Sequence, residues 1–281
     1  MTISNRKSST FISHVLPLAA IFIIVFLYSE NELAAQAWEE LKPGLEKRIF
    51  SVPALDGKSL IAINVVRMNT TNIAEIKIIN VSGSLIQHKT KRFPVYSLRE
   101  VISLFMPQVA INGGSSSSYS VPIAYGLLLQ DKMLMSRINL DSPTLTGIFC
   151  VSKGGFRIIR REEFKAEECV SALQSGPILI EKPGEIAISK DEWQGGEKYR
   201  RSVVAINGQG RLFFITSNET GLYDLASFLV KSESEGGLAC TAALNLSGGE
   251  ESGLYANGGE SFVSGNIDVP ISTAIAVFLK Q

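Results

Sequence analysis

Two adjacent carboxylates, Glu250 and Glu251, lie in the stretch LNLSGGEESGLY, directly after an apolar run. The run stops at Ser247, and Gly248 and Gly249 separate it from the carboxylates. A buried strand that ends in paired glycines lets the backbone approach a ligand closely, because glycine has no Cβ and tolerates positive φ. Hydroxyls and carboxylates at such a strand end could carry acid–base chemistry. A plain turn with solvated glutamates is the alternative interpretation.

A second junction of the same kind occurs earlier in the chain. A brief apolar strand at residues 109–111 runs into Asn112, Gly113 and Gly114, and four serines follow. The Asn112 side chain can donate and accept hydrogen bonds to a ligand, and the two glycines would free backbone amides. A flexible serine-rich loop is the alternative here.

Histidine is almost absent from the chain, which contains only His14 and His88. This excludes a zinc site built on several histidines, and a Ser-His-Asp triad would have to use His88. Because His88 lies in the polar stretch QHKTKR, we interpret it as a solvated loop residue. Acid–base work would then fall to carboxylates, Arg, Lys or Tyr. No CxxC motif occurs, and we expect neither a metal nor a cofactor.

The composition of the 281 residues is that of a globular protein. Hydrophobic residues make up 45% and charged residues 19%, which supports a core and argues against disorder. Lys+Arg and Asp+Glu both number 27, so the formal net charge is zero. Without a basic excess, a nucleic-acid partner is not expected.

The N-terminal segment has the pattern of an export signal. Arg6 and Lys7 precede an apolar run at residues 11–28, and an Ala-x-Ala motif ends at Ala37. A positive region, an apolar region and small residues at a cleavage site are typical of a signal peptide, although the run is also long enough for a membrane anchor. We interpret residues 1–37 as one or the other. Either would place the rest of the chain in the periplasm, outside the cell, or on an outward-facing anchor.

Three cysteines, Cys150, Cys169 and Cys240, are present. An odd number in an exported chain allows at most one disulfide and leaves one thiol. Cys150 and Cys169 could form the bridge. Cys240 begins an alanine-rich strand, and we interpret it as a small core residue.

Alternating apolar residues and turn signals predict many short strands. The predicted strands cover residues 60–67, 75–81, 109–111, 125–129, 133–137, 147–151, 156–160, 178–181, 202–206, 211–215, 240–246 and 271–279.

A capping box at Ser97 and Glu100 predicts one helix. A short entry helix and turn are expected at residues 41–46, and further helices at residues 162–173 and 222–229. Since there is neither a βαβ pattern nor a repeat, we expect an α+β single domain over residues 38–281. This domain would have a mixed, largely antiparallel sheet with a few helices.

Four short motifs follow one another in a definite order. They are Asn112-Gly113-Gly114, Gln174-Ser175-Gly176-Pro177, Arg201-Ser202-Val203 and Asn245-Leu246-Ser247-Gly248-Gly249. The order resembles the phosphodiester glycosidase family, which includes the uncovering enzyme, N-acetylglucosamine-1-phosphodiester alpha-N-acetylglucosaminidase. Bacterial members carry an N-(A/G)-G junction, then Q-S-G-P before a strand, an Arg opening the next strand, and L-D-G-G-x-S ending another. The likeness spans Trp38 to the C-terminus.

The resemblance implies an exported hydrolase that cleaves a glycosyl phosphodiester in envelope or extracellular glycan. It implies a glycan or sugar-phosphate ligand, and a membrane contact only through an uncleaved N-terminal segment. The expected catalytic residues are Glu251, Arg201 and Ser247, with Arg201 as a bidentate contact to phosphate. The implied substrate-binding residues are Asn112, Gly113, Gly114, Ser175, Gly176, Gly248, Gly249 and Ser252.

The chain departs from the family pattern at two positions that matter for chemistry. Ser247 stands where the family has the aspartate of L-D-G-G, and Ser115 begins a pair of serines in place of larger residues. A serine cannot act as a carboxylate acid or base near neutral pH, so Glu251, or otherwise Glu250, would have to supply the carboxylate. The alternative is a catalytically impaired member that binds phosphorylated glycan or serves as an envelope protein.

Overall fold

The computed structural model of the protein describes residues 37–81, 96–117, 122–193 and 196–280. The elements below belong to the unit Trp38–Gln281. Nearly all of the expected leader lies outside the described residues, as do His14 and His88. Among the described residues, no helix has the length and apolar character needed to cross a membrane.

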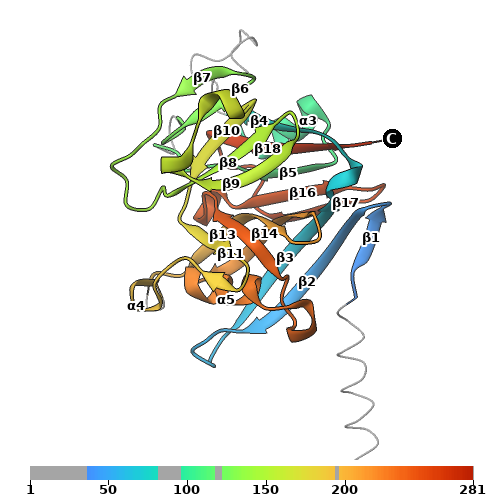
Figure 1. The fold of residues 1–281 in the computed structure, drawn as a ribbon. Coiled ribbons are helices and arrows are strands. Elements are labelled where there is room, and N and C mark those ends of the chain that lie inside the picture. The colour runs from blue at the N-terminus through green and yellow to red at the C-terminus, as the bar shows by residue number, and fades with distance from the viewer. Residues whose placement is uncertain (1–36, 82–95, 118–121, 194–195, 281) are drawn as a thin grey trace, which may run out of the picture. The chain divides into compact units, whose positions relative to one another are not determined.

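The described strands form three sheets, and all their pairings are antiparallel (Figure 1). The large sheet has the order β1 (Glu39–Lys42), β2 (Leu45–Pro53), β3 (Leu60–Asn69), β14 (Arg211–Thr220), β13 (Tyr199–Asn207), β15 (Cys240–Asn245), β11 (Ile178–Lys182), β12 (Glu185–Ile186). The disulfide sheet has the order β7 (Met133–Ser136), β6 (Leu128–Gln130), β10 (Ser171–Ser175), β8 (Gly147–Ser152), β9 (Gly155–Arg160). The C-terminal sheet has the order β17 (Ser261–Gly265), β16 (Gly253–Asn257), β5 (Val109–Asn112), β18 (Thr273–Leu279), β4 (Ile73–Asn80).

The predicted strands are therefore present, with boundaries shifted by a few residues. The expected antiparallel character is confirmed, but the strands divide among three sheets and no parallel pair occurs in the described part. Consecutive strands need not be neighbours: β3 and β4, joined by the short helix η1 (Thr70–Asn72), belong to different sheets. The division into three sheets could not be predicted from the strand patterns. The apolar pattern of a strand indicates which of its faces are buried, but not which strands it pairs with.

The three sheets share a central core. Val66 of the large sheet, Ile111 of the C-terminal sheet and Phe149 of the disulfide sheet all belong to it, and each is fully buried. Successive side chains of a strand point to opposite faces, so Val65, beside Val66, packs instead on the outer face of the large sheet. Both faces of the large sheet are thus buried, which explains why β3 and β13 are apolar along most of their length.

Two helices cover outer faces of the sheets. Helix α5 (Leu222–Val230) packs Leu225 and Leu229 against the outer face of the large sheet (Figure 1). Helix α3 (Leu98–Phe105) packs Leu98 and Val101 against the C-terminal sheet. The α3 capping box is present, with the Ser97 amide donating to the Glu100 carboxylate at 2.6 Å. The helix α4 (Lys190–Trp193) is a single turn. Both longer helices were predicted from their apolar spacing, and both are confirmed.

Two other helix predictions are wrong. Residues 41–46 form the β1–β2 hairpin, whose turn uses Gly44 at φ +77° and buries Leu45 in the central core. Residues 162–173 hold only the short turns η2 (Arg161–Glu163) and η3 (Ala166–Glu168) before β10 begins. Here β10 pairs with β8, so tertiary pairing overrides the helical propensity of the glutamate-rich segment.

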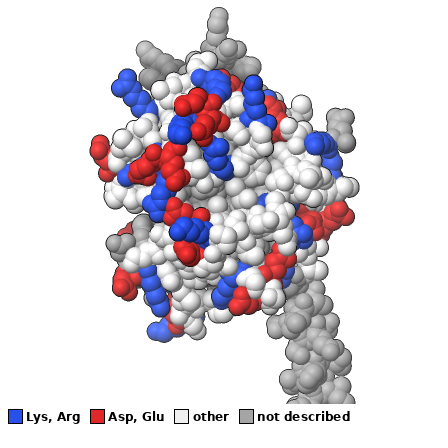
Figure 2. Space-filling view, in the orientation of Figure 1, with Lys and Arg blue, Asp and Glu red and all other residues white. Residues whose placement is uncertain are grey.

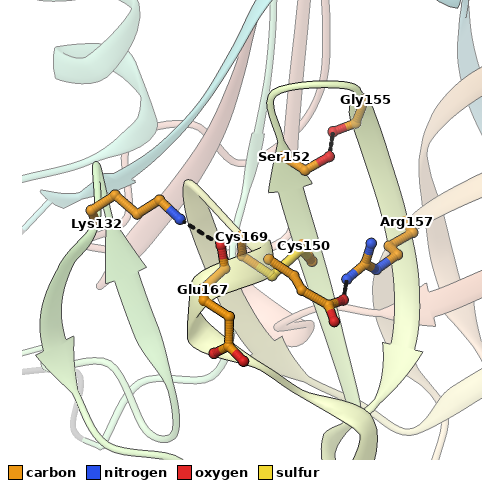
Figure 3. Close-up of a disulfide and its surroundings, with 8 residues drawn as sticks. Lys132, Cys150, Ser152, Gly155, Arg157, Glu167 and Cys169 are labelled. Atoms are coloured by element: carbon orange, nitrogen blue, oxygen red, sulfur yellow. Dashed lines mark hydrogen bonds and ion pairs between the residues drawn. A yellow bond between two sulfur atoms is a disulfide. The ribbon is translucent and has the colours of Figure 1, made fainter.

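The predicted disulfide joins Cys150 of β8 to Cys169, which precedes β10 (Figure 3). The Cα atoms are 5.6 Å apart, and both residues are fully buried. Beside it, Lys132 donates to the carbonyl of Glu167 at 2.9 Å. Cys240 is a buried free cysteine, as expected for a core residue.

Charged side chains of both signs are interspersed on the face drawn in Figure 2. In the described part of the chain, ion pairs join neighbouring segments, among them Arg99 with Asp268 and Arg160 with Glu181. Exposed pairs of this kind contribute little to stability individually.

We expect that replacing Cys150 and Cys169 together by alanine will lower the free energy of unfolding by about 3 kcal/mol. The bridge closes a segment with a sequence separation of 19, and its loss gives the unfolded chain more freedom. Urea unfolding followed by circular dichroism measures the change. Cys240→Ala, which removes the third buried sulfur and keeps the bridge, is the control. A double variant no less stable than this control would contradict the prediction.

Candidate functional site

Three loops that follow strands from different sheets meet at one place. The Asn112 side chain, at the end of β5, donates to the carbonyl of Ser247 at 2.7 Å, and the Ser247 amide donates to the carbonyl of Gly113 at 2.9 Å. The loop after β10 joins them through Asn245, whose side chain donates to the carbonyl of Gly176 at 2.8 Å. The loops around Asn112, Ser175 and Ser247 are therefore brought together, as the candidate site requires.

Asn112 is the centre of a buried polar network. Its Oδ1 accepts hydrogen bonds from the Ser202 hydroxyl at 2.7 Å and from the Gly253 amide at 3.1 Å. The Ser202 hydroxyl also lies 2.9 Å from that of Ser252, which donates in turn to the carbonyl of Arg201 at 3.0 Å. Asn112 and Ser252 are thus occupied inside the protein, where they position the loops. Ser202, which belongs to one of the four motifs but was not predicted as a site residue, takes part equally.

The glycines after β5 serve the fold in a similar way. The amides of Gly113 and Gly114 both donate to Thr273, the first to its carbonyl at 2.7 Å and the second to its hydroxyl at 3.0 Å. A Cβ on Gly113 would lie 2.3 Å from the Thr273 hydroxyl. Contrary to the expectation from sequence, these two amides are not left free for a ligand, because β5 and β18 are neighbours and their ends must approach closely.

Glu251 places its carboxylate beside Ser247. Glu251 lies in the short helix η5 (Gly249–Glu251), which turns the chain back so that the Ser247 hydroxyl donates to Glu251 Oε2. The turn depends on glycine: Gly249 has φ +63°, and a Cβ on Gly248 would lie 2.5 Å from the carbonyl oxygen of Arg200. Only 3% of Glu251 is exposed. Its neighbour Glu250 is exposed and forms an ion pair with Arg200 at 2.6 Å.

The pKa of Glu251 is raised above its ordinary value, chiefly because burial disfavours the charged carboxylate. The hydrogen bond from Ser247 opposes this by stabilising the ionised form. Ser116 lowers the pKa further, although its hydroxyl falls short of regular hydrogen-bond geometry. The effect of burial on the pKa is larger than that of these two hydroxyls. A carboxyl group whose pKa is moved toward neutrality is suited to proton transfer.

Arg201 faces a different environment from Glu251. Its guanidinium donates to the carbonyls of Thr220 at 3.1 Å and Glu197 at 2.9 Å and lies 5.2 Å from the ring centre of Tyr199. Burial lowers the pKa of Arg201 to about 10. Because Ser202 points toward Asn112, the preceding residue on β13 must point to the other face of the sheet.

A cavity of about 680 Å³ adjoins Arg201 on this face. Pro177, Ile178 and Leu222 are among its lining residues, whereas Ser247 and Glu251 are not. The residues expected to form one site therefore form two adjacent groups: a carboxylate cluster at the loops and a guanidinium in a cavity.

The remaining predicted residues, Ser175 and Gly176, lie at the end of β10 and directly after it. Ser175 is fully buried, and its hydroxyl has no partner among the described residues; the same holds for Asn245 Oδ1. Gly176 has φ +158°, and a Cβ there would lie 2.1 Å from the carbonyl oxygen of Thr144. Asn245 was overlooked as a site residue because it reads as an ordinary strand residue. Within the described residues, no group of three or more His, Cys, Asp or Glu could hold a metal ion.

With this geometry in view, the relationship of the chain to known proteins is clear. The profile of the phosphodiester glycosidase family matches residues 106–278, which is more than half of the chain. The protein belongs to this family, and the resemblance drawn from its motifs is confirmed. A search of curated proteins finds no match.

Solved structures show the same fold. The catalytic domain of zebrafish N-acetylglucosamine-1-phosphodiester alpha-N-acetylglucosaminidase, auto-inhibited by its pro-peptide, is 16% identical with a TM-score of 0.63, and the match covers 88% of this chain and 87% of that one. A hypothetical protein from Synechocystis is 14% identical with a TM-score of 0.60, covering 85% and 62%. A protein of Burkholderia pseudomallei described as exported is 8% identical with a TM-score of 0.51, covering 78% and 74%.

We expect Glu251→Gln to stabilise the protein at neutral pH. The raised pKa of Glu251 means that the folded state binds its proton more tightly than the unfolded state. The group thus favours folding below its unfolded pKa, and this contribution is lost as the pH rises through the folded pKa. Glutamine resembles the protonated form, so the variant should have a Tm higher by about 2–4 °C at pH 7.5.

Thermal unfolding at a series of pH values measures this difference, which should shrink toward pH 4. Glu250→Gln, at the exposed neighbour, is the matched control and should change the Tm little. A Glu251→Gln variant less stable than the wild type at pH 7.5 would contradict the prediction.

Proposed function

We propose that the protein hydrolyses a glycosyl phosphodiester and that Glu251 provides the carboxylate for the reaction. The observation that carries this proposal is the hydrogen bond from the Ser247 hydroxyl to the buried Glu251 carboxylate. Ser247 stands where the resembling family pattern has an aspartate. A carboxylate four residues further along the chain reaches that same side chain, so the function of the substituted group can be supplied from a displaced position.

In the proposed reaction, water attacks the anomeric carbon of the sugar and the bond from that carbon to the phosphate oxygen breaks. The products are the free sugar and a phosphate monoester, which retains that oxygen. A phosphate monoester is a weakly basic leaving group and needs little proton donation, so the more useful role for the carboxylate is to take a proton from the attacking water. A raised pKa makes Glu251 a stronger base for this step.

Arg201 is the proposed contact for the phosphate. Its guanidinium has no ion-pair partner in the described part of the chain and borders the cavity. Arginine binds phosphate through two parallel hydrogen bonds. In this proposal the sugar lies toward Glu251, and the phosphate lies toward Arg201.

A second candidate function is phosphoglycan binding without turnover. The observation that favours it is the internal use of Asn112, Ser252 and the amides of Gly113 and Gly114, which leaves fewer groups to stabilise a transition state. For either function we propose a location outside the cytoplasm. The disulfide supports this, because such bonds persist mainly in oxidising compartments.

Release of sugar from nucleotide sugars and nitrophenyl glycosyl phosphodiesters tests the hydrolase proposal. We expect Glu251→Gln to lower kcat by a factor of about 10²–10⁴, since it removes the base and keeps the shape of the side chain. Glu250→Gln is the matched control and should retain wild-type turnover. Turnover unaffected by Glu251→Gln would exclude the mechanism, and binding of these compounds without any turnover would favour the second function.

The pH dependence of the reaction provides an independent test. With Glu251 as base, kcat/KM should fall as the pH drops through the raised pKa of this group. Ser247→Ala removes a hydrogen bond that stabilises the carboxylate, so the pKa of Glu251 should rise. The acidic limb of the profile should then move to higher pH. A limb that stays in place in this variant would show that Glu251 does not control it.

A further inference from the structure

The guanidinium of Arg201 carries a charge that no carboxylate neutralises among the described residues. Two of its five N–H groups donate to backbone carbonyls, of Thr220 and Glu197, and the other three have no partner there. A half-buried cation without a counterion is unfavourable unless an anion joins it. With a pKa of about 10, Arg201 is still protonated at neutral pH. The cavity beside it is therefore suited to an anionic ligand.

The other charged side chains that line the cavity have hydrogen-bond partners among the described residues. Arg160 also lines it, but Glu181 holds that guanidinium through two hydrogen bonds. Glu197, which is exposed, accepts a hydrogen bond from the Tyr199 hydroxyl. Arg201 is thus the lining cation whose charge stays open to a ligand.

Beyond Arg201 the floor of the cavity is apolar. Pro177, Ile178, Ile188 and Leu222 form it, and all four are buried. The cavity, at about 680 Å³, falls within the size range of small-molecule sites.

Backbone polar groups of this floor already have partners inside the protein. The Ile178 amide donates to the Thr146 hydroxyl at 2.9 Å, and the Ala187 amide donates to a strand carbonyl at 2.8 Å. Pro177 has no amide hydrogen, and its carbonyl accepts a hydrogen bond at 3.1 Å.

Hydroxyls also line the cavity: that of Thr146 accepts the Ile178 amide, that of Thr144 lies 3.3 Å from the Ser142 hydroxyl, and Ser189 is exposed. Hydroxyl groups of a ligand would therefore find few unoccupied partners on the buried floor, and buried hydroxyls without partners are unfavourable. The transfer of an alkyl chain from water to this apolar floor is favourable, because the chain needs no hydrogen-bond partners.

We infer that this cavity binds the phosphate together with the group beyond it, and that this group is an alkyl chain rather than a second sugar. The ligand class is therefore a lipid-like alkyl phosphate. That the alkyl phosphate is the leaving half of a substrate rests on the proposed hydrolase function. That the cavity binds an alkyl phosphate does not. The sugar of such a substrate would face Glu251, and hydrolysis would release the alkyl phosphate into the cavity.

Titration calorimetry of the full chain with n-hexyl phosphate, inorganic phosphate and mannose 6-phosphate tests the inference. We expect n-hexyl phosphate to bind at least about tenfold more tightly than the other two, because only its chain matches the floor. Equal or tighter binding of mannose 6-phosphate would overturn the alkyl assignment, and so would inorganic phosphate binding as well as n-hexyl phosphate.

Two variants locate the site. Arg201→Gln should weaken n-hexyl phosphate at least about tenfold, because it removes a charge-assisted contact. Arg200→Gln is the matched control on the same strand. Arg200 pairs with Glu250 away from the cavity, so this variant should leave binding unchanged.

Ala187→Trp, at an exposed lining position, should weaken the binding of n-hexyl phosphate and leave that of inorganic phosphate unchanged. Binding that survives both Arg201→Gln and Ala187→Trp would place the ligand elsewhere and overturn the inference.

The sugar-release assay separates this inference from the proposed function. Binding of n-hexyl phosphate at Arg201 without turnover of any phosphodiester would remove the hydrolase and retain the site. Turnover that depends on Glu251 but shows no preference for a glycosyl n-hexyl phosphodiester would retain the hydrolase and overturn the alkyl phosphate as its leaving group.

Discussion

The buried side-chain amide of Asn112 holds together the strand ends on which the candidate site is built. It contacts Ser202 of β13, the carbonyl of Ser247 after β15, and the amide of Gly253 in β16. Leaving any of these buried groups unpaired would cost about 1–3 kcal/mol, so the three segments cannot shift independently. Ser247 is also held through its own amide by Gly113. The place of the Ser247 hydroxyl, and with it that of the Glu251 carboxylate, depends on these contacts of Ser247 with Asn112 and Gly113.

The alternation of side chains along β13 divides the chemistry into two groups. Ser202 faces the polar network, so Arg201 must face the cavity on the α5 side of the large sheet. A single flat sheet could not bring both faces to one ligand. Here β13 begins at a junction of three sheets, and the hydrogen bond between Asn245 and Gly176 connects the loops at that junction. A substrate that used both groups would have to pass over the end of β13, which fits an elongated phosphodiester better than a compact sugar.

Much of this arrangement could be predicted from the sequence, and the limits of that prediction have physical causes. Apolar alternation located the strands, and the spacing of Ser97 and Glu100 located a helix start, because both signals are local. The helix expected over residues 162–173 is absent, because β10 pairs with β8, a contact that local propensity does not encode. Ser202 and Asn245 belong to the quoted motifs, but their roles in the site were not predicted for the same reason: their partners Asn112 and Gly176 are distant in sequence. The side of the sheet that Arg201 faces could be known only after the pairing of β13.

The replacement of the family aspartate by Ser247 is consistent with a single charge in this pocket. An aspartate at position 247 would place a second carboxylate near Glu251, and two carboxylates at that distance cannot both stay ionised at neutral pH. A serine instead donates a hydrogen bond to the one carboxylate present. This hydrogen bond from Ser247 keeps the pKa of Glu251 from rising as far as burial alone would raise it. Ser247 and Glu251 are therefore coupled, because the Ser247 hydroxyl donates a hydrogen bond to the Glu251 carboxylate and opposes the rise in its pKa.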